Sequence, residues 1–453
     1  MNDSDTIAAI CSGVGSSIAI IRISGYKALE IGRQIWKSKH SLNIESSRKF
    51  LLGRILPSAD TSGEVAFAVY MKGPDTFTGE DVLEIHAHGG ATNSRRLLRA
   101  AINAGARQAE AGEFTYRAFI NGKIDLTQAE AVCDFISAHN DNALHLAERQ
   151  MDGVLGKKIK AVREKVMNIL AECEARVDFP EDELDFIPIQ EHLKVIESIE
   201  KELRKLYETK YEGKVIRDGV RAVIAGRPNA GKSSLMNLLL GYERAITTDI
   251  PGTTRDTLEE FVNIRGIPVK LIDTAGLRDS DDIIESMGIQ KTLDSIESSQ
   301  VIIWLLDASS DIRDELAAMT QYLNSADNAI AVWNKTDLIK DNKILPSAPF
   351  EVVEISVKNE LGINNLLDAI ETKVWSHHTK LQNNEVPVSQ RHAEYILQSL
   401  NALPDAISNL KSENWELASI GFKSIINYLG SITGEDASID IYETIFSRFC
   451  IGK

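Results

Sequence analysis

Apolar and polar residues alternate in the first part of the chain, residues 1–120. Short runs with this two-residue period are bounded by glycine, proline or aspartate, which is typical of strands in a half-exposed sheet. The predicted strands are residues 18–24, 65–71 and 82–87. Residues 91–104 instead carry apolar side chains at helical spacing. We therefore expect an N-terminal α+β domain.

Long amphipathic stripes follow at 121–215 and return at 387–446. A segment with two prolines around an acidic run, 178–188, interrupts the first stretch. The apolar positions of the stripes are Leu126, Ala129, Val132, Cys133 and Ile136; Leu155, Ile159, Val162, Val166, Ile169 and Leu170; and Ile396, Leu397, Leu400, Phe422, Ile425, Ile426 and Leu429. Such stripes are usually core, although long ones are also common dimer surfaces. We expect one discontinuous helical domain built from both flanks, because the ends of an inserted domain usually lie close together.

The stretch between these flanks alternates apolar strands with helices, which predicts an inserted, doubly wound and largely parallel sheet. Its strand at 220–225 leads into Gly-Arg-Pro-Asn-Ala-Gly-Lys-Ser-Ser at 226–234, the spacing of a phosphate-binding loop. The glycines let backbone N–H groups close around phosphate oxygens, Lys232 adds positive charge, and Ser233 offers its hydroxyl to Mg²⁺. The sequence therefore predicts a nucleoside triphosphate site.

Four further motifs follow in the order typical of a GTPase. Asp273 and Gly276 follow a second strand, where a carboxylate reaches the outer shell of the metal and a glycine N–H reaches the γ-phosphate. Asp337 follows a third strand, and its carboxylate can accept N1–H and the exocyclic amine of guanine, a pair of donors that adenine lacks. The predicted GTP contacts are Asn229, Ala230, Gly231, Lys232, Ser233, Ser234, Thr248, Asp249, Ile250, Pro251, Gly252, Thr253, Thr254, Asp273, Thr274, Ala275, Gly276, Asn334, Lys335, Thr336, Asp337, Ser356, Val357 and Lys358. The central domain is thus expected to be a Ras-like GTPase.

One catalytic feature of Ras-type GTPases is replaced in this chain. The residue after the glycine of the second switch motif is Leu277, where those proteins carry the glutamine that orients the attacking water. A leucine side chain cannot hydrogen-bond water. The acidic residues Asp279, Asp281, Asp282 and Glu285 are candidates for this role, and a solvated loop face is the alternative for most of them.

Composition narrows the class of protein further. The length of 453 residues suggests about three domains, and the boundaries that we expect are 1–120, 121–216, 217–378 and 379–453.

The four cysteines, Cys11, Cys133, Cys173 and Cys450, form no C-x-x-C pair and have no histidines at metal spacing, which favours a reduced cytoplasm. No apolar run approaches the ~20 residues of a membrane span. A net charge of −16 disfavours broad nucleic-acid affinity, so an RNA contact requires a local patch or a partner's surface.

Two charged residues interrupt predicted strands of the N-terminal domain. Arg22 lies within Ile-Ala-Ile-Ile-Arg-Ile-Ser, and Glu84 lies within Val-Leu-Glu-Ile-His-Ala-His. A lone charge in such a run usually faces solvent from a half-exposed strand. A polar ligand pocket is the alternative.

Motifs over the whole chain resemble the MnmE (TrmE) family of tRNA modification GTPases. They are IIRISG, FTGEDVLE, HGG, GEFTYRAFINGKIDLTQAEA, GRPNAGKSS, TDIPGTTRD, DTAGLR, NKTD and the terminal FCIGK. The resemblance implies an N-terminal domain for dimerisation and for binding 5,10-methylenetetrahydrofolate or another tetrahydrofolate derivative. It also implies a K⁺-stimulated GTPase and a homodimer that joins the FAD-containing partner MnmG in a heterotetramer or larger complex. Together the pair adds a carboxymethylaminomethyl or aminomethyl group to C5 of the wobble uridine of certain tRNAs.

The same resemblance implies roles for individual residues. Arg22, Glu84, Lys123 and Lys453 correspond to folate contacts, which favours the pocket interpretation of Arg22 and Glu84. Ser233 and Thr254 correspond to Mg²⁺ ligands, and Asn229, Thr248, Ile250 and Thr253 to a K⁺ site. Glu285 corresponds to the residue that orients water, and Cys450 to a position important for the modification. Residues 11–17 depart from the family's commoner proline- and glycine-containing version.

Two other classes of function are compatible with the motifs. A GTPase switch in ribosome assembly shares the five GTPase elements and usually carries an RNA-binding appendage. Here Gly-Val-Leu-Gly at 153–156 falls in a predicted helix without the strands of a KH module. The third class is a dimeric scaffold for MnmG without chemistry of its own.

Overall fold

The computed structural model describes most of the chain. The described residues are 5–13, 15–56, 63–138, 140–179, 185–242, 260–273, 294–311, 313–314, 316, 319–320, 327–339, 350–376, 386–436, 439–447, 449 and 451–452. They divide into two compact units. Unit 1 comprises Met1–Cys133, Arg149–Glu200 and Tyr395–Lys453, and unit 2 comprises Asp134–Glu148 and Lys201–Glu394.

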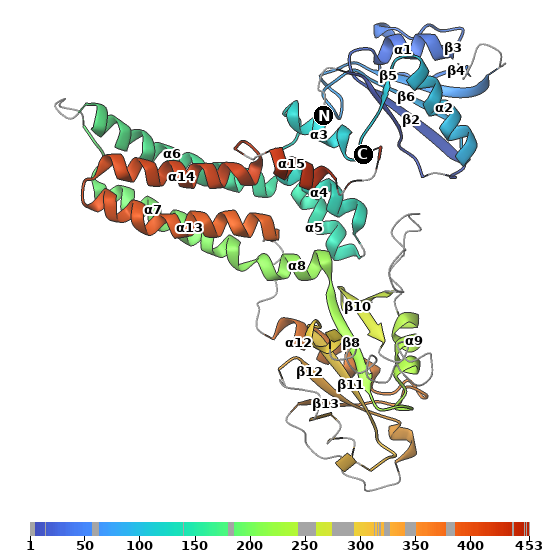
Figure 1. Cartoon of the computed structure of the whole chain (residues 1–453), viewed down its shortest axis with the longest axis vertical. Coiled ribbons are helices and arrows are strands. Elements are labelled where there is room, and N and C mark those ends of the chain that lie inside the picture. Colours follow the sequence, from blue (N-terminus) through green and yellow to red (C-terminus); the bar gives the residue numbers. More distant parts are fainter. Residues whose placement is uncertain are drawn as a thin grey trace. The chain divides into compact units, whose positions relative to one another are not determined.

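Unit 1 begins with a seven-stranded sheet of order β3-β4-β5-β6-β2-β1-β7 (Figure 1). Its elements are β1 Ile7–Ile10, β2 Ile18–Ser24, α1 Ala28–Ile35, β3 Trp36–Lys37, η1 Ile44–Ser46, β4 Leu51–Ile55, β5 Glu64–Met71, β6 Val82–His88, α2 Ala91–Asn103 and β7 Arg107–Gln108. The three predicted strands and the predicted helix are confirmed, while β1, β3, β4 and β7 were not predicted. Alternation places Ile21, Ile23, Leu83 and Ile85 on one face, where they are buried with residues of α1 and α2.

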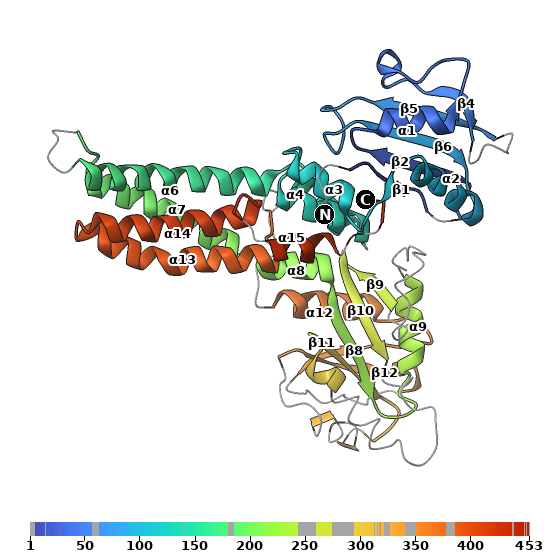
Figure 2. The same ribbon diagram turned by 45° about the horizontal axis from the view of Figure 1, so that its top comes forward.

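The rest of unit 1 is helical. The helices in this part of the chain are α3 Glu113–Ile120, α4 Leu126–Ser137, α5 Asp141–Met151, α6 Val154–Asp178, α7 Ile189–Glu208, α13 Gln390–Lys411, α14 Trp415–Thr433 and α15 Ile439–Phe446; α4, α5, α7 and α13 each extend into unit 2. Helices α6 and α14 lie side by side (Figures 1 and 2), with an ion pair of 2.7 Å between Lys423 and Glu174. Segments far apart in sequence therefore form one helical domain, as predicted.

The predicted stripes are largely buried, with one correction. Leu155, Ile159 and Val162 on α6 and Phe422 and Ile425 on α14 are fully buried. Leu397, assigned to the stripe of α13, is 38% exposed. Ile396 and Leu400 of the same stripe are buried, so Leu397 lies at the exposed edge of the buried face. The proline-containing break is confirmed, since α6 ends at Asp178 and α7 begins at Ile189. The Gly-Val-Leu-Gly stretch lies at the start of α6, as predicted.

Unit 2 contains a six-stranded sheet of order β13-β12-β11-β8-β10-β9. Its elements are α8 Lys210–Asp218, β8 Val220–Gly226, α9 Lys232–Tyr242, β9 Glu260–Ile264, β10 Ile267–Asp273, β11 Val301–Asp307, β12 Ala329–Asn334, η3 Thr336–Leu338, β13 Glu351–Glu354 and α12 Ile363–Trp375. All neighbouring strands are parallel except β9, which pairs antiparallel with β10. This is the predicted doubly wound sheet, with β9 and β11 as unpredicted strands.

Both faces of this sheet are buried, which explains why its strands are almost continuously apolar. On one face, β8 packs with Leu235 and Leu239 of α9 and with Leu366 and Ile370 of α12. On the other face, Trp304 of β11 and Trp333 of β12 belong to one buried apolar cluster. No helix among the described residues has the length and apolar character needed to cross a membrane.

Candidate functional site

The phosphate-binding loop connects β8 to α9. Gly226 has φ 140°, Asn229 φ 66° and Gly231 φ 102°, all in the region that side chains disfavour. A Cβ on Gly226 would lie 2.3 Å from the Leu305 carbonyl oxygen, so the loop requires glycine there. The ammonium of Lys232 donates to the carbonyls of Gly226 and Arg227, both at 3.0 Å, and thereby lies across the loop.

A second group of predicted residues lies at the ends of β12 and β13. The Asn334 amide donates to the Ala230 carbonyl at 2.8 Å, and its oxygen accepts from the Val357 N–H at 3.1 Å. The Ser356 hydroxyl donates to Asp337 Oδ1 at 2.6 Å. Asn334 therefore joins the phosphate loop to both parts of the predicted base pocket, three segments far apart in sequence.

Lys335 is held by an ion pair that was not predicted. Its backbone is left-handed, with φ 65°, and its ammonium lies 2.6 Å from Asp307 Oδ2 at the end of β11. Burial by itself raises the pKa of Asp307, but hydrogen bonds from Lys335 and Ser309 outweigh this and hold that pKa below its ordinary value. The ion pair fixes the turn that carries Asp337. The sequence signal for this contact was Asp307 itself, an aspartate at the end of an apolar run that precedes the Asn-Lys-Thr-Asp strand.

The other predicted nucleotide contacts differ in their exposure to solvent. Asn229, Ser233, Ser234, Asp337 and Lys358 are exposed, Ala230 is buried, and Thr336 is half-buried. Asp273 is the last residue of β10 and lies opposite Ile224, two positions before Gly226. Parallel pairing thus brings the ends of β8, β10, β11 and β12 to one edge of the sheet. Residues 248–254 and 274–276, together with Leu277, Glu285, Cys450 and Lys453, lie outside the described residues.

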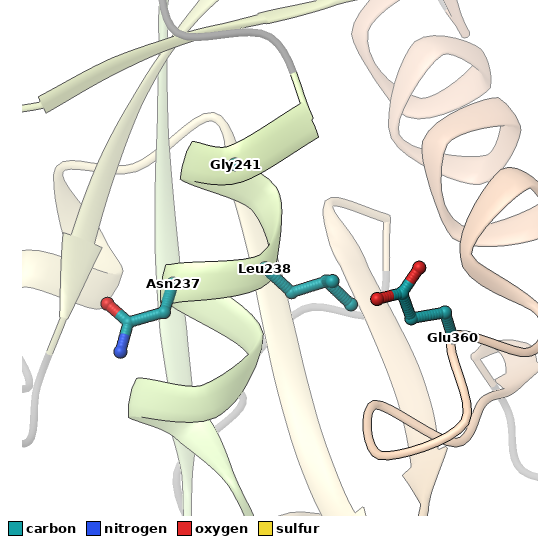
Figure 3. A pocket seen from close by; sticks show the side chains of 4 residues that line it. All are labelled: Asn237, Leu238, Gly241 and Glu360. Atoms are coloured by element: carbon teal, nitrogen blue, oxygen red, sulfur yellow. The ribbon is translucent and has the colours of Figure 1, made fainter.

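A hollow of about 410 Å³ lies beside α9, and none of the predicted residues is among those that line it. It is lined by Asn237, Leu238 and Gly241 of α9 and by Glu360 (Figure 3). Figure 3 shows the Leu238 side chain pointing toward Glu360 and the Asn237 side chain pointing away from it. The candidate nucleotide site is therefore defined by the loop contacts described above and not by this hollow.

In unit 1, the structure brings Arg22 and Glu84 together. They are directly opposite in the β2–β6 register, and Arg22 Nε lies 2.8 Å from Glu84 Oε1. Their side chains are 26% and 17% exposed, so neither is a fully solvated charge. His86 Nε2 lies 3.3 Å from the other oxygen of Glu84. His86 was not among the predicted site residues, although residues 84 and 86 share a face of any strand.

A buried ion cluster lies next to this part of the sheet. Arg117 of α3 contacts Asp5 (2.6 Å), Glu80 (3.0 Å) and Glu113 (3.1 Å), and Arg107 contacts Asp5 and Glu113. Burial raises the pKa of Glu113, but hydrogen bonds from Arg107, the Glu110 N–H and Arg117 outweigh it and lower that pKa below its ordinary value. The cluster ties the start of β1, the 72–81 loop and α3 to one another.

Lys123 and the C-terminal segment belong to other parts of unit 1. Lys123 is exposed and lines a hollow of about 270 Å³ with residues of α4, α6 and the end of α14, and Arg22 and Glu84 are not among its lining residues. Ile451 forms an antiparallel bridge with Ala111. A Cβ on Gly452, whose φ is 101°, would lie 2.4 Å from the Ile10 carbonyl oxygen. The described end of the chain therefore lies directly against β1.

A doubly wound sheet with a phosphate loop after β8 and an Asn-Lys-Thr-Asp turn after β12 defines a P-loop GTPase. Two family models match the chain, the GTP-binding protein TrmE N-terminus over residues 6–123 and the MnmE helical domain over residues 126–450. The chain belongs to the MnmE family.

Named relatives are similar over their full length. The tRNA modification GTPase MnmE of Clostridioides difficile is 42% identical, and that of Alkaliphilus oremlandii 38% identical, each over 99% of both chains. Among solved structures, the G domain of the T. maritima FeoB iron transporter is 23% identical and covers 34% of this chain and 98% of its own, with a TM-score of 0.26.

Proposed function

We propose that this protein hydrolyses GTP to GDP and phosphate and uses that reaction in the modification of tRNA. Membership of the MnmE family supports the pathway. The observation that carries the nucleotide assignment is the hydrogen-bonded connection from Ala230 through Asn334 to Val357. It holds the phosphate loop and the base pocket as one preorganised surface.

Guanine is the base that fits this pocket. Ser356 holds one oxygen of the exposed Asp337 carboxylate, and that carboxylate accepts N1–H and the exocyclic amine of the base edge. Adenine offers no such pair of donors. The left-handed Lys335, held by Asp307, keeps the following residues in this orientation.

The phosphates are bound by the loop after β8. The loop contains three residues at positive φ, a feature of backbone segments whose N–H groups bind anions. Lys232, whose ammonium now donates to two loop carbonyls, supplies positive charge to the β- and γ-phosphates. Ser233 and Thr254 are the Mg²⁺ ligands in this proposal, and Mg²⁺ neutralises charge that develops during phosphoryl transfer.

Hydrolysis proceeds without the glutamine of Ras-type GTPases. Glu285 orients the attacking water, a role that Leu277 cannot fill. Asn229 lies exposed in a left-handed position of the loop and, with Thr248, Ile250 and Thr253, is proposed to bind K⁺. A cation there supplies the positive charge that an arginine finger supplies elsewhere, where it is worth about 10³–10⁵ in rate.

The N-terminal domain is proposed to bind a tetrahydrofolate derivative through Arg22, Glu84, Lys123 and Lys453. The half-buried Arg22–Glu84 pair supports this, as does the position of Gly452 against β1, which brings the C-terminal segment to the same sheet. The bound folate supplies the one-carbon unit. Cys450 belongs to the same segment and is proposed to act in the modification itself.

The proposed assembly is a homodimer that binds tRNA and the FAD-containing partner MnmG in a heterotetramer or larger complex. The sheet face that carries Glu84 also exposes apolar side chains, including Phe50 (60%), Leu52 (57%) and Phe67 (47%), which supports burial of these apolar side chains in a dimer. In this proposal the chain divides into dimerisation domain 1–120, a helical domain of 121–216 and 379–453, and GTPase domain 217–378.

Two experiments test the proposal. Nucleoside analysis of tRNA from cells that lack the protein is expected to show wobble uridines without the aminomethyl-type group at C5, restored by the wild-type chain. A normal wobble nucleoside profile in those cells would instead favour a switch or scaffold. In purified protein, GTP turnover is expected to be much faster in K⁺ than in Na⁺ at constant Mg²⁺, and Glu285→Ala should lose turnover while keeping nucleotide affinity.

A further inference from the structure

Glu84 is held at both carboxylate oxygens by neighbours on its own sheet face. Arg22 Nε lies 2.8 Å from Oε1, and His86 Nε2 lies 3.3 Å from Oε2. Arg22 comes from the neighbouring strand β2, and His86 lies two residues beyond Glu84 on β6. One donor alone would leave the carboxylate free to rotate about its terminal bond. Two donors on different oxygens define the plane of the group.

Each donor is itself supported by an aromatic ring. The Arg22 guanidinium lies 5.6 Å from the ring centroid of Phe114, which is fully buried. The His86 ring lies edge-on to Phe50, with centroids 5.2 Å apart and an interplanar angle of 75°. Phe50 in turn contacts Phe67, the β5 residue opposite His86, with centroids 6.4 Å apart. Packing therefore limits the positions that both donors can take.

The remaining acceptor capacity of Glu84 has a defined geometry. An ionised carboxylate has about four lone-pair sites, two on each oxygen. Arg22 and His86 each occupy a site on a different oxygen, so each oxygen keeps a further acceptor site in the same plane. Two coplanar acceptors on one carboxylate match two parallel N–H donors, as in the N–H and exocyclic amine of a 2-amino-4-oxopyrimidine ring. The pterin of a reduced folate carries this edge.

We propose that His86 is a positioning residue that, with Arg22, orients Glu84 to bind the 2-amino-4-oxopyrimidine edge of a reduced folate. The inference rests on the proposed folate-binding function and adds to it the residue that sets the orientation of Glu84. The partial exposure of the three side chains, 17% to 26%, leaves the carboxylate accessible to a ligand while protecting its hydrogen bonds from full solvation.

The test is calorimetric titration of the intact protein with 5-formyltetrahydrofolate and with its analogue in which a methyl group replaces the 2-amino group. His86→Leu removes the donor, and His86→Gln keeps an amide donor. We expect His86→Leu to weaken binding of 5-formyltetrahydrofolate by about three- to tenfold, the usual value of one hydrogen bond, and His86→Gln to restore much of the loss. The methyl analogue should bind wild type and His86→Leu with nearly equal affinity, because it lacks the second donor.

His88→Leu is the matched control. His88 lies on the same strand and face but contacts Glu64, at 3.3 Å, so its replacement should leave folate affinity unchanged. Wild-type affinity of His86→Leu for 5-formyltetrahydrofolate would overturn the inference, as would equal weakening of both ligands, which indicates general disruption of the sheet face. Absence of folate binding by the wild-type protein would instead overturn the proposed folate function itself.

Discussion

Replacing Arg117 by methionine tests how much the buried ion cluster stabilises unit 1. The guanidinium is 3% exposed and donates to Asp5 Oδ1 (2.6 Å), the Asp5 carbonyl (2.8 Å), Glu80 Oε1 (3.0 Å) and Glu113 Oε1 (3.1 Å). Methionine fills much of the volume but supplies no donor. Glu113, whose side chain is 1% exposed, then remains buried with one cationic partner fewer. Breaking a buried pair in this way costs about 3–5 kcal/mol.

The lower end of that range is expected for Arg117→Met. Arg107 still contacts both Asp5 and Glu113, and Ser24 still donates to Glu80 at 2.7 Å. About 3 kcal/mol corresponds to an approximately hundredfold fall in the equilibrium constant for local folding. Because a chain of several domains does not unfold as one unit, hydrogen exchange at the amides of β1 and α3 is the appropriate assay.

The control is Lys423→Met, which removes an ion pair whose side chains are 58% and 44% exposed. Exposed pairs contribute less than about 1 kcal/mol, so protection of α14 should change by less than about fivefold. Protection of β1 and α3 in Arg117→Met within threefold of wild type would refute the argument that the cluster stabilises this part of unit 1.

The same cluster predicts a pH dependence. Burial raises the pKa of Asp5 and of Glu113, but hydrogen bonds from Arg107 and Arg117 outweigh it, so both pKa values are lowered in the folded state. A lowered carboxyl pKa contributes stability above the pKa of the unfolded chain, and this contribution is lost as the pH falls through the folded value. Wild-type protection should therefore decrease below about pH 5, and Arg117→Met should show a shallower decrease.

Three further substitutions test the GTPase domain. Gly231→Ala should reduce GTP affinity by about tenfold or more, because φ is 102° and a Cβ there would lie 2.4 Å from the Asn334 side-chain nitrogen. Gly241→Ala is the control: no atom lies within 4 Å of its Cβ, so this variant should bind GTP normally in the same titration. Asp337→Asn should weaken GTP binding and favour xanthosine triphosphate, and unchanged selectivity in competition titrations would contradict the base-pocket assignment. The side-chain amide of Asn142 donates to the Gly266 carbonyl at 3.0 Å, so Asn142→Ala should raise hydrogen exchange in the β9–β10 hairpin by about three- to tenfold. Unchanged exchange would show that this contact does not hold the turn.

The kinds of element and the order of the GTPase motifs could be predicted from the sequence. Strand and helix periodicity are local properties, so 18–24, 91–104 and the break before Ile189 could be predicted without knowing what lies beside them. The phosphate loop is also local, because its glycines and Lys232 lie within a few residues of one another. Chemistry contained in one short segment can be inferred from that segment.

Strands such as β1, β3 and β7 escaped prediction because they are short. Their periodicity covers at most four residues, which is too few to distinguish a strand from an irregular run. Pairing with neighbouring strands, and not their own pattern, makes them extended. Leu397 was misassigned for a related reason, since a stripe of apolar residues predicts a buried face but not its edge.

Which polar residues meet across the chain depends on how its segments pair and pack. Arg22 and Glu84 are separated by 62 positions, and their pairing depends on the register of β2 and β6, which sequence periodicity leaves open. His86 contacts Glu84 from two residues along the same strand, so only the Arg22 contact depends on that register. Asn334 joins a loop 104 positions away, and Arg117 contacts Asp5 across 112 positions. Long-range contacts depend on the packing of the whole unit, whereas each segment's own pattern specifies only its secondary structure.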